Sequence, residues 1–431
     1  MRSAESNHSN IWDLYGLKGN PFSPNPIGPE NKNDMPIEGF EKFKRINDFL
    51  DIIKNRLESE SGTISVVYGE TGVGKTSFVN YALHLVENKR FYVKVDVEHG
   101  WTKKEFVINT LSKILNSLGK FLDKKTIKEI VVNSLTIFGY SLMKRVSNLS
   151  ISDLKNIIGN NEKNSIPIDS DFLEELFKSI TKRLYTKYGK ELIIVYDDLG
   201  NLNGEKDEEE IETIEDIFNS LRDNVFRTNN VHFVFICDPK TNFILHGMQR
   251  IRDVLSKPSI FLREMNKDEI IDVIEHRIEV MRKRSQKSPK PLYGNGVLEL
   301  LYDIYGGNIR SILNRLNSIF GSYASGKPIT KADVIANIKK EVKANIQALD
   351  ISHKPKKEKE IINYLARSKS KNGKAKSGNI AHALGISNSE VRRYIEKDLG
   401  DIIYQSVTAK DIYWTLDPEI RWLIKNHYLT I

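Results

Sequence analysis

The chain of 431 residues contains a single cysteine, Cys237, so an internal disulfide is excluded. Cys237 lies in an apolar run, and we expect it to be an ordinary core residue of a protein that works in the reducing cytoplasm. Proline is also scarce. Four of the 13 prolines fall between residues 11 and 35, and together with several turn residues they predict an irregular N-terminal strap.

Long hydrophobic runs are missing as well. The first residues lack the apolar stretch of a secretory signal peptide. The most apolar helical stretch, Ile130–Met143, is short for a bilayer span and is interrupted by Asn133, Ser134, Thr136 and Gly139, which favours a core helix. With 39% hydrophobic and 28% charged residues, the composition is typical of a soluble protein without a membrane partner.

Positive charge is concentrated near the C-terminus. The formal net charge is +8, and residues 354–397 alone hold twelve basic and four acidic side chains, an excess equal to that of the whole chain. The rest of the chain is therefore close to neutral. A basic field confined to one segment favours a nucleic-acid partner for that segment.

The strongest motif begins after Thr63–Tyr68, a β-branched and aromatic stretch that predicts a buried strand. The next eight residues match the phosphate-binding pattern G-x-x-x-x-G-K-[ST] at every fixed position. In such a loop backbone N–H groups face the β-phosphate, Lys75 reaches the β- and γ-phosphate oxygens, and Thr76 holds Mg²⁺. We predict an ATP-binding loop formed by Gly69, Glu70, Thr71, Gly72, Val73, Gly74, Lys75, Thr76 and Ser77.

Two acids end a second buried strand, Leu192–Tyr196. Ligands of open α/β sheets bind at the carboxyl ends of the strands. Asp197 suits the Mg²⁺-holding role of a Walker B acid, and Asp198 would polarise the attacking water. Capping of the next helix by these acids is the simpler alternative, but the phosphate loop upstream makes it much less favoured.

A third acid, Asp238, ends the apolar strand Val231–Cys237. A polar side chain here would lie beside the γ-phosphate, between the phosphate-loop strand and the Asp197 strand. Asp238 could equally start the turn at Pro239, and the sequence favours neither interpretation.

The order of elements predicts the fold class and four regions. Strands alternate with helices as far as Leu262, and only helices follow up to about residue 350, which indicates a parallel sheet with a helical lid. The predicted regions are an irregular strap over residues 1–37, an α/β P-loop core over 38–264 with a helical insertion at about 118–168, a helical lid over 265–350 and a winged-helix domain over 351–431.

The winged-helix prediction rests on two short helices and a hairpin. Gly385 lies at the tight turn of a helix-turn-helix, and residues 402–406 and 411–416 can pair as a wing. Side chains early on the second helix enter the major groove, and basic loops meet phosphates. The candidate contacts to double-stranded DNA are Lys374, Lys376, Asn388, Ser389, Arg392 and Arg393. A protein-docking module is the alternative, against which the net charge argues.

The order of these motifs resembles AAA+ ATPases of the replication-initiator clade, from residue 15 to about 420. The stretch from Tyr15 to Phe22, YGLKGNPF, is also similar to the strap of transposition-regulator and ExeA-type ATPases. The resemblance implies that Arg310, in GGNIR, contacts the γ-phosphate as sensor 2 and that Asp238 is sensor 1. It further implies ATP hydrolysis with Mg²⁺ at a site between subunits of a homo-oligomer or of related AAA+ proteins.

The chain departs from that family at three points. Initiators usually carry Asp-Glu where this chain has Asp197-Asp198, and Asn, Ser or Thr where it has Asp238, which predicts slow hydrolysis. The insertion at 118–168 is not part of the minimal pattern. Arg250 and Arg252 are candidates for the arginine finger that completes a neighbour's site, although two solvated surface arginines are the more favoured interpretation.

We therefore expect a cytoplasmic, DNA-binding AAA+ ATPase. The first alternative is a switch of the STAND type, which also uses Asp-Asp, in which ATP is held and the winged helix docks a protein partner. The second is a motor similar to the secretion-linked ATPases that share the NPF strap, disfavoured by the basic winged helix and the absence of an evident membrane segment.

Overall fold

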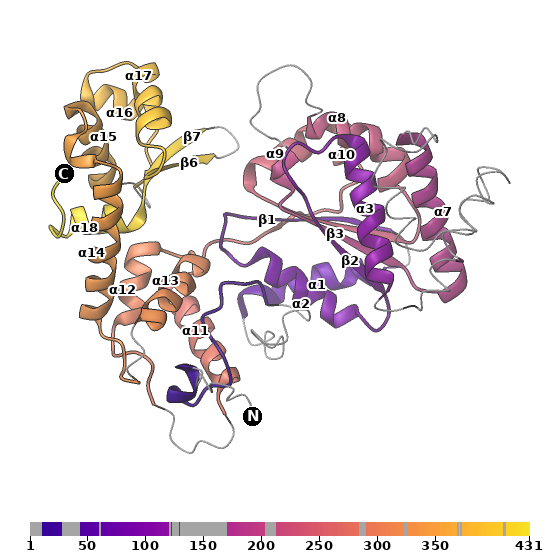
Figure 1. Cartoon of the computed structure of the whole chain (residues 1–431). Helices are drawn as coiled ribbons and strands as arrows, with labels where there is room; N and C mark the ends of the chain where they lie inside the picture. Colours follow the sequence, from indigo (N-terminus) through magenta and orange to yellow (C-terminus); the bar gives the residue numbers. More distant parts are fainter. Residues whose placement is uncertain are drawn as a thin grey trace, which may run out of the picture. The chain divides into compact units, whose positions relative to one another are not determined.

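The computed structural model describes residues 11–27, 44–59, 62–119, 122, 129, 170–202, 213–283, 290–322, 326–368, 370, 373–407 and 411–431. These residues form two compact units (Figure 1). We call Phe40–Glu70 with Lys75–Leu262 the sheet unit, and Arg263–Ile431 with Met1–Gly39 and Thr71–Gly74 the C-terminal unit. The predicted insertion at 118–168 lies almost entirely outside the described residues.

The sheet unit alternates strands and helices. Its strands are β1 (Ile64–Tyr68), β2 (Phe91–Asp96), β3 (Leu192–Asp197), β4 (Val231–Cys237) and β5 (Ile260–Phe261). Its helices are α1 (Lys44–Leu57), α2 (Lys75–Val86), α3 (Lys103–Leu118), α7 (Ser170–Tyr188), α8 (Ile214–Leu221), α9 (Pro239–Gly247) and α10 (Gln249–Arg252). A 3-10 helix spans Leu199–Leu202, and a π-helical turn spans Arg222–Phe226.

The five strands are parallel and lie in the order β2-β3-β4-β1-β5. β3 and β4 are buried along nearly their whole length, which explains why both are continuous apolar runs without polar alternation. β4 lies between β3 and β1, as expected for the strand that ends before Asp238. The carboxyl ends of β1, β3 and β4 therefore meet at one edge of the sheet, where Glu70, Asp197 and Asp238 lie.

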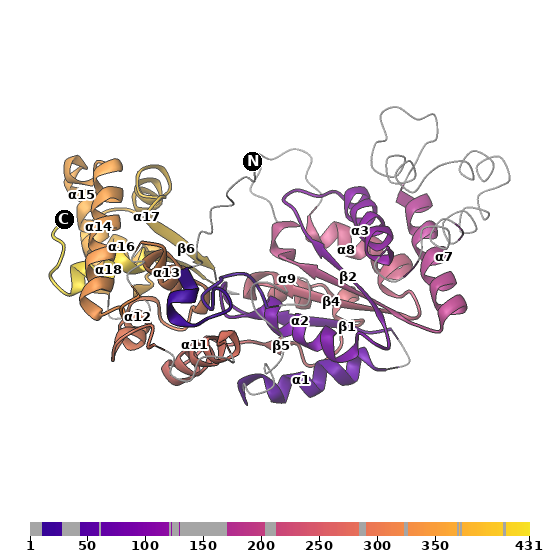
Figure 2. The same ribbon diagram turned by 60° about the horizontal axis from the view of Figure 1, so that its bottom comes forward.

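Helices cover both faces of the sheet (Figures 1 and 2). α1 and α2 lie on one face, and α3, α7 and α8 lie on the other. The second face carries a continuous apolar core, in which Phe106 of α3 stacks on Tyr196 of β3 with 4.6 Å between ring centroids. The Tyr196 hydroxyl lies 2.9 Å from the Thr110 hydroxyl, so this deeply buried polar group is paired. The sheet is thereby held as a rigid base for the loops at its edge.

The C-terminal unit is helical apart from one hairpin. Its helices are α11 (Lys267–Met281), α12 (Val297–Tyr305), α13 (Ile309–Ser322), α14 (Lys331–Ala348), α15 (Lys356–Arg367), α16 (Ser377–Leu384), α17 (Asn388–Arg393) and α18 (Pro418–Lys425). Short 3-10 helices span Ile11–Tyr15 and Ile351–His353, and a π-helical turn spans Tyr394–Asp398. β6 (Ile403–Val407) and β7 (Ile412–Leu416) pair antiparallel, as expected for a wing.

The described part of the strap packs into this unit. Phe22 stacks on Phe320 of α13 with ring centroids 5.1 Å apart, and Trp12 and Tyr15 contact the same ring. The guanidinium of Arg277, which is 4% exposed, donates hydrogen bonds to the carbonyl oxygens of Pro21 and Ser23 at 2.7 and 2.6 Å. The NPF stretch is therefore part of the core of the C-terminal unit.

The predicted fold class is confirmed: a five-stranded parallel P-loop sheet is followed in the chain by helices and then by a winged-helix arrangement. Within the described residues, no helix combines the length and the apolar character that a membrane span requires.

Candidate functional site

The phosphate loop joins β1 to α2. Gly72 and Gly74 have φ values of +82° and +94°, a backbone region that L side chains rarely adopt, so glycine is required at both positions. Lys75 Nζ donates hydrogen bonds to the carbonyl oxygens of Gly69 and Glu70 at 2.9 and 3.0 Å. Burial lowers the pKa of Lys75, and the neighbouring acidic groups oppose this shift. The ammonium is thus held over the loop that would cradle a phosphate.

Thr76 and Asp197 bring two oxygen ligands together. Thr76 Oγ1 donates a hydrogen bond to Asp197 Oδ2 at 2.8 Å. Burial raises the pKa of Asp197, while the hydrogen bond from Thr76 lowers it. A hydroxyl and a carboxylate oxygen are the ligands that Mg²⁺ prefers, and this ion keeps waters and substrate phosphates as its other ligands. The pair therefore fits Mg²⁺, although no cluster of three or more His, Cys, Asp or Glu side chains among the described residues could hold a metal unaided.

Asp198 has an unusual backbone. Its φ is +55°, in the left-handed region, and its side chain is exposed beyond the end of β3. The following turn is fixed because Asn201 N donates to Asp198 O at 2.9 Å and Asn201 Nδ2 donates to Val97 O at 2.7 Å. Strained backbone at a site edge persists only where the surroundings hold it. The Asp198 carboxylate is thereby available to solvent beside the half-buried Asp197.

Asp238 caps α9. Its Oδ1 accepts a hydrogen bond from Thr241 N at 2.8 Å, and its Oδ2 accepts one from Thr241 Oγ1 at 3.2 Å. The side chain also lies against Gly200, where an added Cβ would come within 2.5 Å of Asp238 Oδ2. Of the two interpretations that the sequence left open, the helix-starting one matches these hydrogen bonds.

The two arginine-finger candidates lie on α10. Arg250 is 59% exposed and pairs with Asp223 at 3.1 Å, and Arg252 is exposed. Asp223 also pairs with Arg222 and Arg227. Arg250 is consequently oriented by a carboxylate that three arginines share.

Arg310 belongs to the C-terminal unit and lies at the start of α13, with its side chain exposed. The preceding GGN is explained by packing: a Cβ at Gly307 would lie 2.4 Å from Met265 O, and Asn308 Oδ1 accepts a hydrogen bond from Ser311 N at 3.1 Å. The start of α13 is therefore fixed within its own unit.

The predicted helix-turn-helix consists of α16, a turn at Gly385 with φ of +64°, and α17. Ser387 caps α17, and Glu390 completes the capping box. All four predicted contact residues on α17 are exposed, and the Arg393 guanidinium lies over the Tyr394 ring at 4.8 Å from its centroid. These residues are Asn388, Ser389, Arg392 and Arg393.

The two predicted loop lysines contact the hairpin. Lys374 Nζ donates a hydrogen bond to Ser406 Oγ at 2.8 Å, and Lys376 pairs with Asp411 at 2.8 Å while lying over the Tyr413 ring. Both lysines consequently brace the wing against the loop before α16. The contact of these lysines with the hairpin could not be predicted from the spacing of lysines and serines in the sequence.

Sequence analysis missed Gly200, Asn201 and Asp223. Gly200 provides space for Asp238, Asn201 fixes the turn after Asp198, and Asp223 orients Arg250. A glycine and an asparagine that follow the acidic pair after one leucine were a usable signal, because turn residues there imply a sharp change of chain direction. Nothing in the sequence pointed to Asp223.

Comparison with known proteins finds one family model that matches part of the chain. Residues 44–250 match the model described as the KAP family P-loop domain. No curated protein is similar enough to this sequence to count as a match.

Several solved structures are similar over nearly the whole chain. The ORC2 protein of Aeropyrum pernix is 16% identical, with 95% of this chain and 98% of that chain covered and a TM-score of 0.49. CDC6P from Pyrobaculum aerophilum is 15% identical, with coverages of 94% and 98% and a TM-score of 0.44. The Walker-type ATPase paby2304 of Pyrococcus abyssi is 13% identical, with coverages of 94% and 99% and a TM-score of 0.47.

The family match covers the phosphate loop, the acidic pair after β3 and Asp238. It agrees with a parallel sheet in which these motifs share one edge. Residues 44–250 of this chain are thus similar to the P-loop domain of the KAP family.

Proposed function

We propose that the chain is an ATPase that binds ATP with Mg²⁺ at the edge of the sheet, hydrolyses it to ADP and phosphate, and holds duplex DNA with α16 and α17. The observation that carries the nucleotide part is the hydrogen bond between Thr76 and Asp197, next to Lys75 and the glycines at positive φ. The hydroxyl and the carboxylate suit a metal ion, and the ammonium and the loop suit a phosphate, so together they fit a nucleotide with its metal ion.

Each residue of the site has its own role in the proposed hydrolysis of ATP. Lys75 binds the β- and γ-phosphate oxygens, and the N–H groups at the start of α2 bind the β-phosphate. Thr76 and Asp197 would hold Mg²⁺, and the ion would supply positive charge beside the phosphate oxygens. Asp198 orients the attacking water and accepts its proton. In the replication-initiator resemblance, Arg310 adds positive charge at the γ-phosphate.

The DNA part is supported by the exposed side chains of α17 and by the basic excess of residues 354–397. Arginine reads guanine in the major groove, and asparagine reads adenine. Arg392, Arg393 and Asn388 would therefore meet base edges, while Lys374 and Lys376 hold the wing near the backbone phosphates. Arg250 and Arg252, exposed on α10, remain the candidates for reaching the nucleotide of a neighbouring subunit.

A switch that holds ATP without rapid turnover is the second candidate. Two observations favour it. Both carboxylate oxygens of Asp238 accept hydrogen bonds from Thr241 at the start of α9, and the residue after Asp197 is an aspartate, whose side chain is shorter than that of glutamate. Under this proposal the exposed face of α17 docks a protein.

The experiment is to measure ATP binding and ATP turnover of the full chain with and without duplex DNA, at low and moderate salt. Lys75→Ala should lose nucleotide binding. Replacement of Arg392 and Arg393 by alanine should abolish the stimulation of turnover by DNA. Replacement of Lys340 and Lys343, two exposed lysines on α14, is the control that removes the same charge elsewhere.

Stimulation by DNA that fades with salt supports the proposal, because phosphate contacts release counterions. A rate near zero with nucleotide bound in all conditions supports the switch. An equal loss of stimulation in the control variant would mean that the stimulation depends only on the total charge of the protein. That result would exclude α17 from the DNA interface.

A further inference from the structure

A buried arginine in the C-terminal unit joins four helices. Arg315 of α13 is 8% exposed. Its Nε donates a hydrogen bond to the Tyr305 hydroxyl at 3.0 Å, and its Nη1 donates to Asn337 Oδ1 at 2.8 Å and to Glu341 Oε2 at 2.5 Å. Its Nη2 donates to Glu419 Oε1 of α18. Every nitrogen of the guanidinium is thereby used, on partners from α12, α14 and α18.

Glu419 is the only one of these partners that follows the lid region in the chain. Its side chain is 13% exposed, and it also accepts a hydrogen bond from the Tyr305 hydroxyl. Burial raises the pKa of Glu419, and Arg315 offsets this shift. Glu341, in contrast, is 42% exposed and belongs to α14. One guanidinium thus makes a contact within the α12–α14 helices and a second contact to α18.

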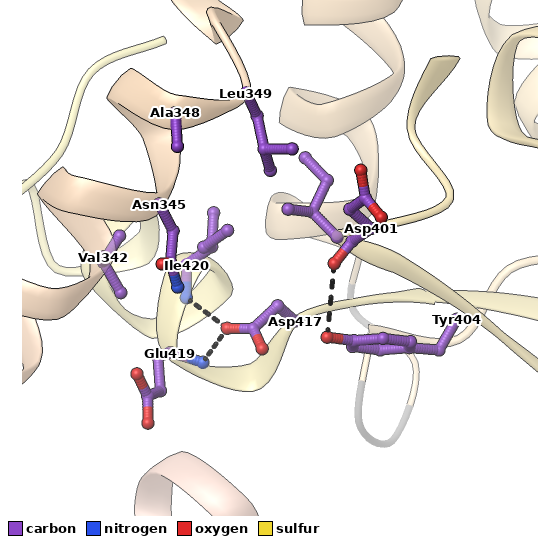
Figure 3. A pocket seen from close by; sticks show the side chains of 10 residues that line it. Val342, Asn345, Ala348, Leu349, Asp401, Tyr404, Asp417, Glu419 and Ile420 are labelled. Atoms are coloured by element: carbon purple, nitrogen blue, oxygen red, sulfur yellow. Dashed lines mark hydrogen bonds between the residues drawn. The ribbon is translucent and has the colours of Figure 1, made fainter. Parts of the chain in front are cut away.

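A cavity of about 270 Å³ lies next to this contact (Figure 3). The residues that line it include Val342, Asn345 and Leu349 from α14 and its end, together with Tyr404 and Ile420. The cavity therefore separates part of α14 from the elements around the hairpin. Val342 of α14 and Ile420 of α18 are buried beside the cavity, so the contact of Arg315 with Glu419 adds a specific polar pair to apolar packing.

The chain that connects the two groups of helices is short and contains a strained residue. α14 ends at Ala348, and Asp350, exposed and with φ of +48°, precedes the 3-10 helix Ile351–His353 that leads to α15. A non-glycine residue in the left-handed region is strained, and a change of its backbone angles would relieve that strain. The junction at Asp350 therefore links α12–α14 to α15–α18 through the backbone, and the Arg315–Glu419 contact links them through side chains.

We propose that Arg315 and Glu419 form a latch that fixes α15–α18 to α12–α14, and that opening the latch lets residues 356–431 turn about the junction at Asp350. Arg310 and Arg315 share α13 and are separated by about one and a half helical turns. The role of this latch in coupling nucleotide to DNA rests on the proposed function. A shift of α13 when Arg310 meets nucleotide would be transmitted to α18, and therefore to the DNA-binding helix that belongs to the same fold.

The first experiment needs neither ATP nor DNA. Hydrogen exchange of the full chain is compared for the parent protein and for Glu419→Gln, Tyr305→Phe and Glu341→Gln. Glu419→Gln keeps the shape of the side chain and removes its charge, and Tyr305→Phe removes the hydroxyl shared by Arg315 and Glu419. Glu341→Gln is the matched control, because it removes the other carboxylate from the same guanidinium.

We expect Glu419→Gln and Tyr305→Phe to speed exchange of amides in residues 349–356 and in α18 roughly tenfold or more, because the first removes the charge that strengthens a buried hydrogen bond and the second removes the hydroxyl that bridges Arg315 and Glu419. Glu341→Gln should leave these amides nearly unchanged. Equal effects of Glu419→Gln and Glu341→Gln, or faster exchange throughout both units, would overturn the latch.

The second experiment measures nucleotide affinity with and without duplex DNA. In Glu419→Gln the effect of DNA on nucleotide affinity should disappear, while the affinity without DNA stays that of the parent protein. Retention of the DNA effect would overturn transmission through the latch. If the parent protein binds no DNA, the proposed function fails, while the exchange experiment still decides whether the latch exists.

Discussion

Thr76 and Asp197 are 121 residues apart in the chain, and their side-chain oxygens lie 2.8 Å apart. The parallel sheet causes this meeting, because β1 and β3 flank β4 and end at the same edge. A cation that bound between these two oxygens would replace the hydroxyl proton as the partner of the carboxylate.

The first prediction concerns this pair. Asp197→Asn removes the negative charge while leaving an acceptor for Thr76, so affinity for Mg²⁺ with nucleotide should fall by at least roughly tenfold. Nucleotide affinity measured in the presence of a chelator should change little. Thr76→Ser keeps the hydroxyl and should behave like the parent protein. An unaltered Mg²⁺ dependence in Asp197→Asn would remove Asp197 from the metal site.

The second prediction concerns Asp198. Asparagine tolerates the left-handed backbone, so Asp198→Asn should keep the fold and the binding of nucleotide. Loss of the carboxylate that orients water should reduce turnover roughly a hundredfold or more. Single-turnover ATP hydrolysis measures this step directly. Turnover equal to that of the parent protein would exclude Asp198 from the reaction.

The third prediction concerns DNA. Replacing Arg392 and Arg393 by alanine should weaken binding to a duplex roughly 10- to 100-fold and reduce the salt dependence of the affinity. Fluorescence anisotropy over a range of salt concentrations gives both quantities. An unchanged affinity, together with unchanged affinity of the Lys340 and Lys343 control, would favour the docking function of α17.

The fourth prediction concerns Gly200. A Cβ at this position would lie 2.5 Å from Asp238 Oδ2 and 3.2 Å from Thr241 Oγ1, so Gly200→Ala must displace the cap of α9. We expect a loss of about 1–3 kcal/mol in the free energy of unfolding. Gly247→Ala, in the same helix region with no atom within 4 Å of the new Cβ, should gain about 0.5 kcal/mol. Equal stability of the two variants in urea unfolding would contradict the clash.

The fifth prediction concerns pH. His232 is fully buried, with Nε2 at 3.1 Å from Glu191 Oε2 and Nδ1 at 3.0 Å from Thr63 Oγ1. Burial, together with the nearby Arg90, lowers the pKa of His232 to about 4. As the pH falls, His232 is therefore protonated near pH 6.5 in the unfolded chain but only near pH 4 in the folded chain.

Stability should accordingly be complete above pH 6.5 and should decrease between pH 6.5 and 4, with a contribution from His232 of about 3 kcal/mol. Urea unfolding at several pH values measures this slope. His232→Gln should flatten the slope within that window. A variant with the parent slope would show that other groups account for the loss.

The strands were predictable because a strand that is buried on both faces is a continuous apolar run in the sequence. Val231–Cys237 is apolar throughout since both of its faces are covered, and the same reason holds for Leu192–Tyr196. The phosphate loop was predictable because its backbone needs glycine at fixed positions. From these two signals the gathering of Lys75, Asp197 and Asp238 at one edge followed.

The remaining features depend on contacts between distant segments. The sequence shows Asp238 at a strand end, but only the structure shows both of its oxygens turned to Thr241. A linear pattern of lysines does not reveal that Lys376 pairs with Asp411. Arg315 resembles any helical arginine until Glu419, 104 positions later, is placed beside it.

The packing of the strap has a consequence for how the chain folds during synthesis. The Tyr15 hydroxyl donates to the carbonyl oxygen of Lys327, 312 positions later, and Asn20 bonds to Asn317, 297 positions later. The aromatic side chains of the strap therefore emerge long before Phe320 and α13 exist to cover them. The sheet unit can complete its core while translation continues, whereas the C-terminal unit must recruit the strap after most of the chain has been made.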